Sequence, residues 1–223
     1  STPTAGTSNV RFGVNAGNSI ASGGNYNTVV GDEAGTSITT GDNNVAVGFG
    51  AGDSATTAAQ NVLVGSLAGD AGTTFYNNVA IGYLALSADT LGSNTVAIGK
   101  SALAVQNFTS STDAFNVAIG SSAGASVTTG TLNTLLGGLT GDALTTGNNN
   151  TALGMASLGN DTQGSKSTAV GVAALFQQNF TSATDSYNTA VGYNAGTSVT
   201  TGTNNTLIGG LAGDAITTGG NSV

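Results

Sequence analysis

The pentapeptide NVAVG at residues 44–48 recurs along the chain in slightly varied form, as NVLVG at 61–65, NVAIG at 78–82 and NTALG at 150–154. The glycines that close these pentads and their relatives are Gly13, Gly31, Gly48, Gly65, Gly82, Gly99, Gly120, Gly137, Gly154, Gly171, Gly192 and Gly209. We call them the anchor glycines. Their spacing is 17 residues, apart from one interval of 18 and two of 21. A fixed period of this length is typical of a protein that stacks one structural unit per repeat.

A longer period of 72 residues relates Gly48, Gly120 and Gly192. It combines three units of 17 residues with one of 21, and it begins at about Asn44, whereas residues 1–43 depart from it. In such arrays each unit contacts mainly its neighbours. We therefore expect residues 1–223 to form a single repeat domain with divergent N-terminal coils.

Each pentad has the pattern of a β-strand that is buried on both faces. The residue before the anchor glycine is always apolar, and Val or Thr usually stands two positions earlier, on the same face of the strand. The residue between them is also apolar in every unit except at Arg11. A strand that is apolar on both faces needs cover on both. We expect one face to fill the interior of a coil and the other to form an oligomer interface, made of Ala46, Leu63, Ala80, Ala97, Ala118, Leu135, Ala152, Ala169, Ala190 and Leu207.

The second half of the unit favours a narrow coil. It contains a small alanine, a Thr-Thr pair such as Thr56-Thr57, and corners rich in Gly and Asn, which tolerate positive φ. We expect the Thr pairs to form a second strand, and the Asn residues to hydrogen-bond from coil to coil. Helical periodicity is absent. The sequence therefore predicts an all-β fold, a parallel β-solenoid of about twelve 17-residue coils arranged as a side-by-side homotrimer.

The composition excludes most catalytic and binding chemistries. The chain has no His and no Cys, and charged residues make up 6% of it, with a net charge of −8. We therefore expect no enzyme activity, no catalytic residue, no cofactor and no metal site. A chain so poor in Lys and Arg is not expected to bind nucleic acid, and no apolar run is long enough for membrane insertion.

The two longer units carry matching insertions, QNFTSSTDAFN at 106–116 and QNFTSATDSYN at 178–188. Four extra residues do not fit the regular coil, so each segment is expected to bulge outward, and loops on a rigid scaffold often carry recognition. Aromatic rings beside Asn, Thr and Asp are common where sugars bind, which makes a cell-surface glycan a candidate ligand. The candidate contact residues are Asn107, Phe108, Asp113, Phe115, Asn179, Phe180, Asp185 and Tyr187. Alternatively, these aromatic rings pack beneath the loop.

A family resemblance is carried by TVAIG at 95–99, which Lys100, Ser101 and Ala102 follow, and by NTAVGYNAG at 188–196. These segments resemble the head repeats of trimeric autotransporter adhesins, the YadA-like or Hep/Hag class, and related repeats of bacteriophage tail fibres. The resemblance implies a left-handed parallel β-roll in which three chains pack side by side to form an attachment device.

Together these patterns predict a non-enzymatic structural fibre protein that acts as a rod in surface attachment, located outside the cell, on the cell surface or on a virion. Two alternatives remain open at this stage. The sequence stops part-way through a new pentad at 219–223, so subunits could stack end to end into a filament. The Thr-rich stretches could also bind ice, if their hydroxyl groups form a regular exposed row.

Overall fold

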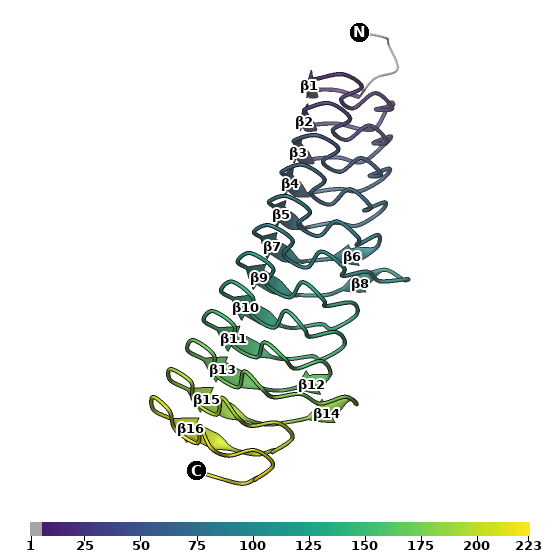
Figure 1. The fold of residues 1–223 in the computed structure, drawn as a ribbon. Helices are drawn as coiled ribbons and strands as arrows, with labels where there is room; N and C mark the ends of the chain where they lie inside the picture. The colour runs from purple at the N-terminus through teal and green to yellow at the C-terminus, as the bar shows by residue number, and fades with distance from the viewer. Residues whose placement is uncertain (1–5) are drawn as a thin grey trace. The chain divides into compact units, whose positions relative to one another are not determined.

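The computed structural model describes residues 6–223, which form a parallel β-solenoid of about twelve coils of about 17 residues each (Figure 1). Its strands are two or three residues long, and residues 6–223 contain no helix. The chain divides into two compact units, of which the first ends at Ala114 and the second comprises Phe115–Val223. The predicted solenoid is therefore confirmed, whereas the homotrimer stays a prediction.

In the first unit, each coil contributes one three-residue strand to a parallel sheet. These strands are β1 (Val10–Phe12), β2 (Thr28–Val30), β3 (Val45–Val47), β4 (Val62–Val64), β5 (Val79–Ile81) and β7 (Val96–Ile98). Neighbouring strands pair in register, so Val45 lies beside Val62 of the next coil. A separate two-stranded parallel sheet joins β6 (Gly92–Ser93) to β8 (Thr112–Asp113).

The second unit repeats this arrangement. Its main strands are β9 (Val117–Ile119), β10 (Thr134–Leu136), β11 (Thr151–Leu153), β13 (Thr168–Val170), β15 (Thr189–Val191) and β16 (Thr206–Ile208). A two-stranded sheet joins β12 (Gly164–Ser165) to β14 (Thr184–Asp185). The longer coil does not disturb the register, because Ala169 of β13 still pairs with Ala190 of β15.

In the three-residue strands from β2 onward, the central residue points into the coil and the residues on either side of it point outward, whereas all three residues of β1 are exposed. In β3, Ala46 is 1% exposed while Val45 and Val47 are half-buried. The predicted oligomer interface therefore lies on the wrong face, because a second chain cannot reach side chains inside the coil. This correction applies to all ten residues assigned to that interface, namely Ala46, Leu63, Ala80, Ala97, Ala118, Leu135, Ala152, Ala169, Ala190 and Leu207.

The anchor glycines are required by the close stacking of the coils. Gly137 has a φ of +136°, and a Cβ atom on it would lie 2.7 Å from the backbone carbonyl carbon of Gly154 in the next coil. Only glycine combines that backbone conformation with the absence of a side chain. The 17-residue period therefore records the contact of one coil with the next.

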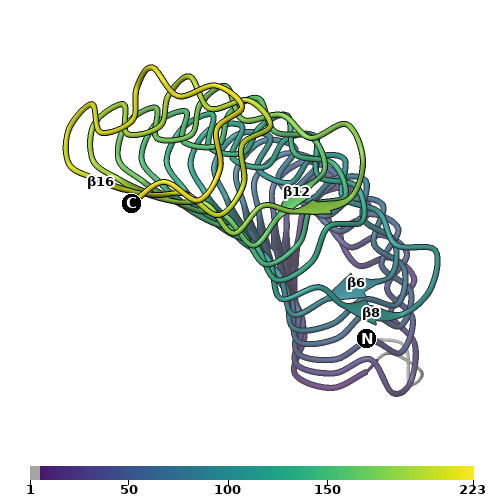
Figure 2. The ribbon, with the colours of Figure 1, turned by 90° about the horizontal axis from the view of Figure 1, so that it is seen from below.

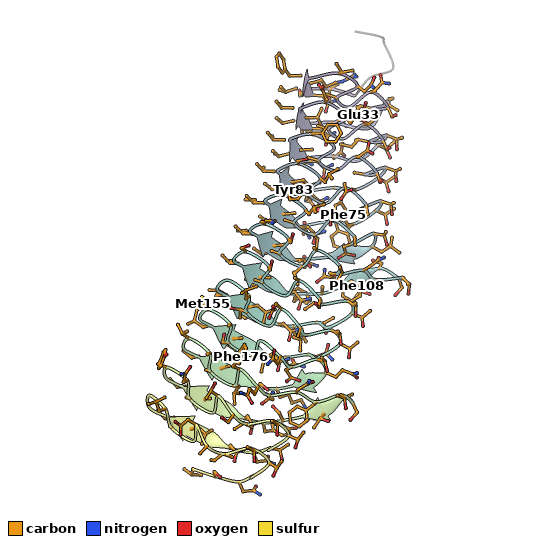
Figure 3. The ribbon with its side chains drawn as sticks, in the orientation of Figure 1. Glu33, Phe75, Tyr83, Phe108, Met155 and Phe176 are labelled. Atoms are coloured by element: carbon orange, nitrogen blue, oxygen red, sulfur yellow. The ribbon has the colours of Figure 1, made fainter. Side chains whose placement is uncertain are left out.

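In several coils only one of two interior positions carries a large side chain, either the strand centre or the position four residues after the anchor glycine. In the coils of Ala46, Ala118 and Ala190 both positions are small. Where the strand contributes Leu63, the position four residues after the anchor is Gly69, and a Cβ atom there would lie 2.7 Å from Leu63 Cδ2. Where the strand contributes Ala169, that position is the fully buried Leu175. Phe75 is also fully buried in the interior, and its label in Figure 3 marks it between the two sides of the coil.

Buried asparagines link successive coils, as the sequence predicts. In the second unit, Asn133 Nδ2 donates to the carbonyl oxygen of Gly147 at 2.9 Å and thereby ties together the two ends of one coil. Asn133 Oδ1 accepts the backbone N–H of Asn150 in the next coil at 3.0 Å. The row consists of Asn27, Asn44, Asn61 and Asn78 in the first unit and Asn116, Asn133, Asn150, Asn188 and Asn205 in the second. Thr95 and Ser167 take this place in the two coils that carry the insertions.

The Thr pairs do not form the expected second strand. The backbone N–H and the hydroxyl group of Thr56 both donate to the carbonyl oxygen of Thr73, at 3.0 and 3.1 Å. The backbone thus still bonds from coil to coil, but the Thr pairs form a bend and not a strand. The second residue of the pair, Thr57, is left exposed to solvent.

Candidate ligand-binding site

The two insertions widen their coils into bulges, the first at 109–113 and the second at 181–185. The tips at 109–111 and 181–183 are exposed. The first bulge returns through β8, which lies beside β6, as Figure 2 also shows, and the second returns through β14 beside β12. The expected outward bulging is confirmed within each unit.

The candidate contact residues separate into exposed and buried groups. The exposed group consists of Asn107, Asp113, Phe115, Asn179, Asp185 and Tyr187. Phe108 and Phe180, by contrast, are only 5% and 6% exposed. A Cβ atom on Gly92 would lie 2.7 Å from Phe108 Cδ2, so this ring packs closely on the coil beneath the bulge (Figure 3). Phe108 and Phe180 are therefore corrected from ligand contacts to packing residues.

A buried carboxylate holds the root of the second bulge in place. Asp161 is fully buried, and its Oδ1 accepts the backbone N–H groups of Gly164 at 3.0 Å and Phe180 at 3.1 Å. Its Oδ2 accepts Nε2 of the buried Gln178 at 2.6 Å. The carboxylate thereby joins the strand before the bulge to the segment that enters it.

Buried serine hydroxyls extend this network behind the surface. Gln178 Nε2 also donates to Ser167 Oγ at 2.8 Å, and the Ser167 and Ser186 hydroxyl oxygens lie 2.6 Å apart. Ser186 Oγ in turn donates to the carbonyl oxygen of Ser165 at 3.1 Å. These three serines alternate along the chain with outward-facing residues, so the network fixes the backbone of the surface that they support.

The surface in front of this network carries Lys166, Asp185 and Tyr187, which we call the Lys–Asp–Tyr cluster. Lys166 Nζ lies 2.7 Å from Asp185 Oδ2 and 3.1 Å from the hydroxyl oxygen of Tyr187. It also lies 5.1 Å from the centroid of the Tyr187 ring, within the range of a cation–π contact. The hydrogen bond from Lys166 lowers the pKa of the Asp185 carboxyl, and the hydrogen bond to Asp185 raises the pKa of the Lys166 ammonium. The pair is therefore fully charged at neutral pH.

The first bulge presents a related cluster without a cation. Asp113 Oδ1 accepts the hydroxyl group of Tyr76 at 3.0 Å and Asn94 Nδ2 at 2.8 Å. The hydrogen bond to Asp113 raises the pKa of the Tyr76 hydroxyl. Beneath this bulge, the buried Asp89 accepts Nε2 of Gln106 at 2.6 Å, and burial raises the pKa of the Asp89 carboxyl.

Sequence reasoning missed Lys166 as a member of the site. It lies nineteen residues before Asp185, and the two meet only because the insertion lengthens the coil between them. The sequence could have pointed to Lys166, because it is one of only three Lys and Arg residues in the chain. Tyr76 and Asn94 were missed for the same reason, because each comes from an earlier coil than Asp113.

The clusters offer hydrogen-bonding groups and aromatic rings, which suit binding. In the described part of the chain, no group of three or more His, Cys, Asp and Glu residues could hold a metal ion. Within residues 6–223, no helix is long and apolar enough to cross a membrane.

The Thr pairs display only one hydroxyl group per coil, since the other bonds to the next coil. The exposed row in the first unit contains Thr40, Thr57 and Thr74, and Leu91 takes the next place. In the second unit, Gln163 follows Thr129 and Thr146 at the same place. Such short single rows do not favour the ice-binding alternative.

Comparison with protein-family models, with curated proteins and with solved structures finds no match to this chain.

Proposed function

We propose that this chain is a non-enzymatic structural fibre protein, extracellular or virion-borne, that acts as a rod in surface attachment. In this proposal the outward face of the main sheet packs against further copies of the chain. The observation that carries it is the apolar column on that face, where every coil places an apolar residue directly before its anchor glycine. In the second unit the column consists of Ile119, Leu136, Leu153, Val170, Val191 and Ile208.

Large exposed side chains lie beside this column, on the residue that follows the anchor glycine. Met155 is 56% exposed and Tyr193 is 61% exposed, and Figure 3 shows Tyr83 and Met155 at the strand-bearing edge of their units. Exposed apolar surface of this extent marks an interaction site more often than open solvent contact.

The occupant that fits best is a second copy of the chain. A copy laid alongside presents the same column at the same spacing, so apolar residues meet apolar residues along the whole contact. No charged residue occupies the outward strand positions or the position after the anchor in the second unit. Because the chain has a net charge of −8, the lack of charge on this face of the second unit removes a source of repulsion between two copies. The resemblance to trimeric adhesin heads and phage tail fibres supports three copies and a role in attachment.

Light scattering after size exclusion, with negative-stain images of the same peak, tests this proposal. We expect the mass of three chains and short rods. Val191→Asp should reduce the mass to that of one folded chain, whereas Thr201→Asp, at an exposed Thr of the same coil, should leave the assembly intact. A wild-type monomer would contradict the proposal, and long threads of variable mass would favour end-to-end filaments instead.

A further inference from the structure

Two members of the Lys–Asp–Tyr cluster occupy a backbone conformation that does not suit them. Lys166 and Tyr187 have φ values of +61° and +50°, in the left-handed region that Gly and Asn occupy most readily. Other coils place Asn149 and Asn204 at this corner, with φ values of +58° and +59°. This corner has a positive φ in every described coil, including at the exposed Tyr26 and Leu132, with values of +57° and +60°. The conformation therefore belongs to the coil and does not by itself mark a functional residue.

The side chain of Tyr187 does not fill the interior of its coil. Leu175 has the same φ of +50°, but its side chain is fully buried and fills the interior of the coil. Tyr187 is 52% exposed, so about half of its surface remains in contact with water. What distinguishes Tyr187 from the other corner residues is its contact with Lys166 Nζ at 3.1 Å and with Asp185 Oδ2 at 3.3 Å.

The backing of the cluster is unusually complete for a surface feature. Ser165 and Ser167 lie on either side of Lys166, and Ser186 lies between Asp185 and Tyr187. All three serines belong to the buried network that Asp161 and Gln178 anchor. Recognition surfaces gain affinity when their displayed groups are already fixed in place.

We propose that the Lys–Asp–Tyr cluster binds a neutral saccharide built of hexose or N-acetylhexosamine units. This inference rests on the proposed role in surface attachment and names the class of ligand. The half-exposed ring of Tyr187 offers an apolar surface for the C–H face of a sugar ring. Asp185 accepts hydrogen bonds from a pair of adjacent sugar hydroxyls, and Lys166 donates to a sugar oxygen.

The charge of the site favours a neutral ligand over an acidic one. Lys166 and Asp185 neutralise each other, so the cluster itself has no net charge. The chain as a whole carries −8 and repels an anionic sugar. A single exposed site of this size is expected to bind weakly, and several copies on one fibre would raise the avidity.

Titration of the intact protein with neutral oligosaccharides of hexoses and N-acetylhexosamines, beside sialic-acid and uronic-acid oligosaccharides, tests the inference. The decisive variant is Tyr187→Asn, because Asn suits a φ of +50° and should leave the fold intact while removing the ring. We expect it to weaken neutral-sugar binding about tenfold or more, a loss typical of a central aromatic contact. Asp185→Asn should also weaken binding.

Tyr26→Asn is the matched control. Tyr26 lies at the same corner of a coil in the first unit, with a φ of +57° and 61% exposure, and has no lysine partner. Its replacement should leave binding unchanged. The inference is overturned if no neutral saccharide binds, if only acidic ones bind, or if Tyr187→Asn binds as tightly as the wild type. Because the oligomer mass is measured separately, rods that bind no sugar would contradict this inference alone, and a sugar-binding monomer would contradict only the rod.

Discussion

Asn44 Nδ2 lies 3.0 Å from Oδ1 of Asn27 in the preceding coil and 2.7 Å from the carbonyl oxygen of Ala58 at the far end of its own coil. One side chain thus both closes its own coil and joins it to the preceding one. Because the amide is buried, each of these groups depends on the others for its hydrogen bonds. The asparagine row therefore joins successive coils in the interior by side-chain hydrogen bonds, as the main sheet joins them by backbone hydrogen bonds.

Replacing one member of this row should destabilise the solenoid strongly. Asn133→Ala leaves the carbonyl oxygen of Gly147 and the N–H of Asn150 without their side-chain partner. We expect a loss of about 3 kcal/mol in the free energy of unfolding, measured by chemical denaturation. Asn160→Ala, at an exposed position, is the control and should change stability by less than about 0.5 kcal/mol. Equal effects of the two substitutions would show that the buried row is not a main source of stability.

Of the neighbouring Gly137 and Gly138, only the first should be intolerant of substitution by alanine. Gly137→Ala forces a Cβ atom against the backbone of Gly154 at a φ of +136°, and we expect it to abolish stable folding of that coil. A Cβ atom on Gly138 would find its nearest neighbour, Ser121 O, at 3.8 Å, so Gly138→Ala should be tolerated. Circular dichroism and thermal melting distinguish the two variants. Tolerance of Gly137→Ala would contradict the close coil contact.

Aspartate substitutions at neighbouring residues of β15 test which face of the strand points into the coil. Ala190 is fully buried, and Ala190→Asp would place an unpaired carboxylate in the interior of the coil. We expect a loss of about 4 kcal/mol or more, and an unfolded or aggregated second unit. Val191→Asp, one residue further on and half-exposed, should keep the circular dichroism spectrum of the wild type. A folded Ala190→Asp variant would restore the interface that the sequence alone suggests.

The sequence predicts the coil and the asparagine row because both depend on residues that recur every 17 positions. It does not predict which strand face is interior, because all three strand residues are often apolar, as in Val62–Val64. The structure shows that the central residue is the interior one, because the narrow coil has room only for Ala, Val or Leu at that position. Sequence reasoning identifies Asp185 and Tyr187 as candidate contacts but misses Lys166, because Lys166 comes from the coil before the insertion. Phe180 is misassigned because exposure of a loop does not imply exposure of each residue in it.

The last prediction concerns two carboxylates in successive coils, Asp53 and Asp70. Burial raises the pKa of both, and the negative charge of Glu33 adds to the effect at Asp53. The charge of Asp53 likewise raises the pKa of Asp70, whose Oδ1 is buried without a hydrogen-bond partner. A carboxyl with a pKa that is higher in the folded state binds protons more tightly there. Its contribution to stability is therefore unfavourable at neutral pH and improves as the pH falls toward the folded-state pKa.

We therefore expect Asp70→Asn to raise the melting temperature at pH 7 and to make it less dependent on pH between 7 and 4. Asp185→Asn should instead lower the melting temperature at pH 7. The hydrogen bond from Lys166 lowers the pKa of the Asp185 carboxyl, so the charged carboxylate stabilises the fold at pH 7 and this contribution is lost only in stronger acid. Melting curves of the two variants and the wild type across this pH range separate the cases. If Asp70→Asn melts at a lower temperature than the wild type at pH 7, the charge of Asp70 stabilises the coil instead, and an unidentified partner of its buried oxygen becomes the better explanation.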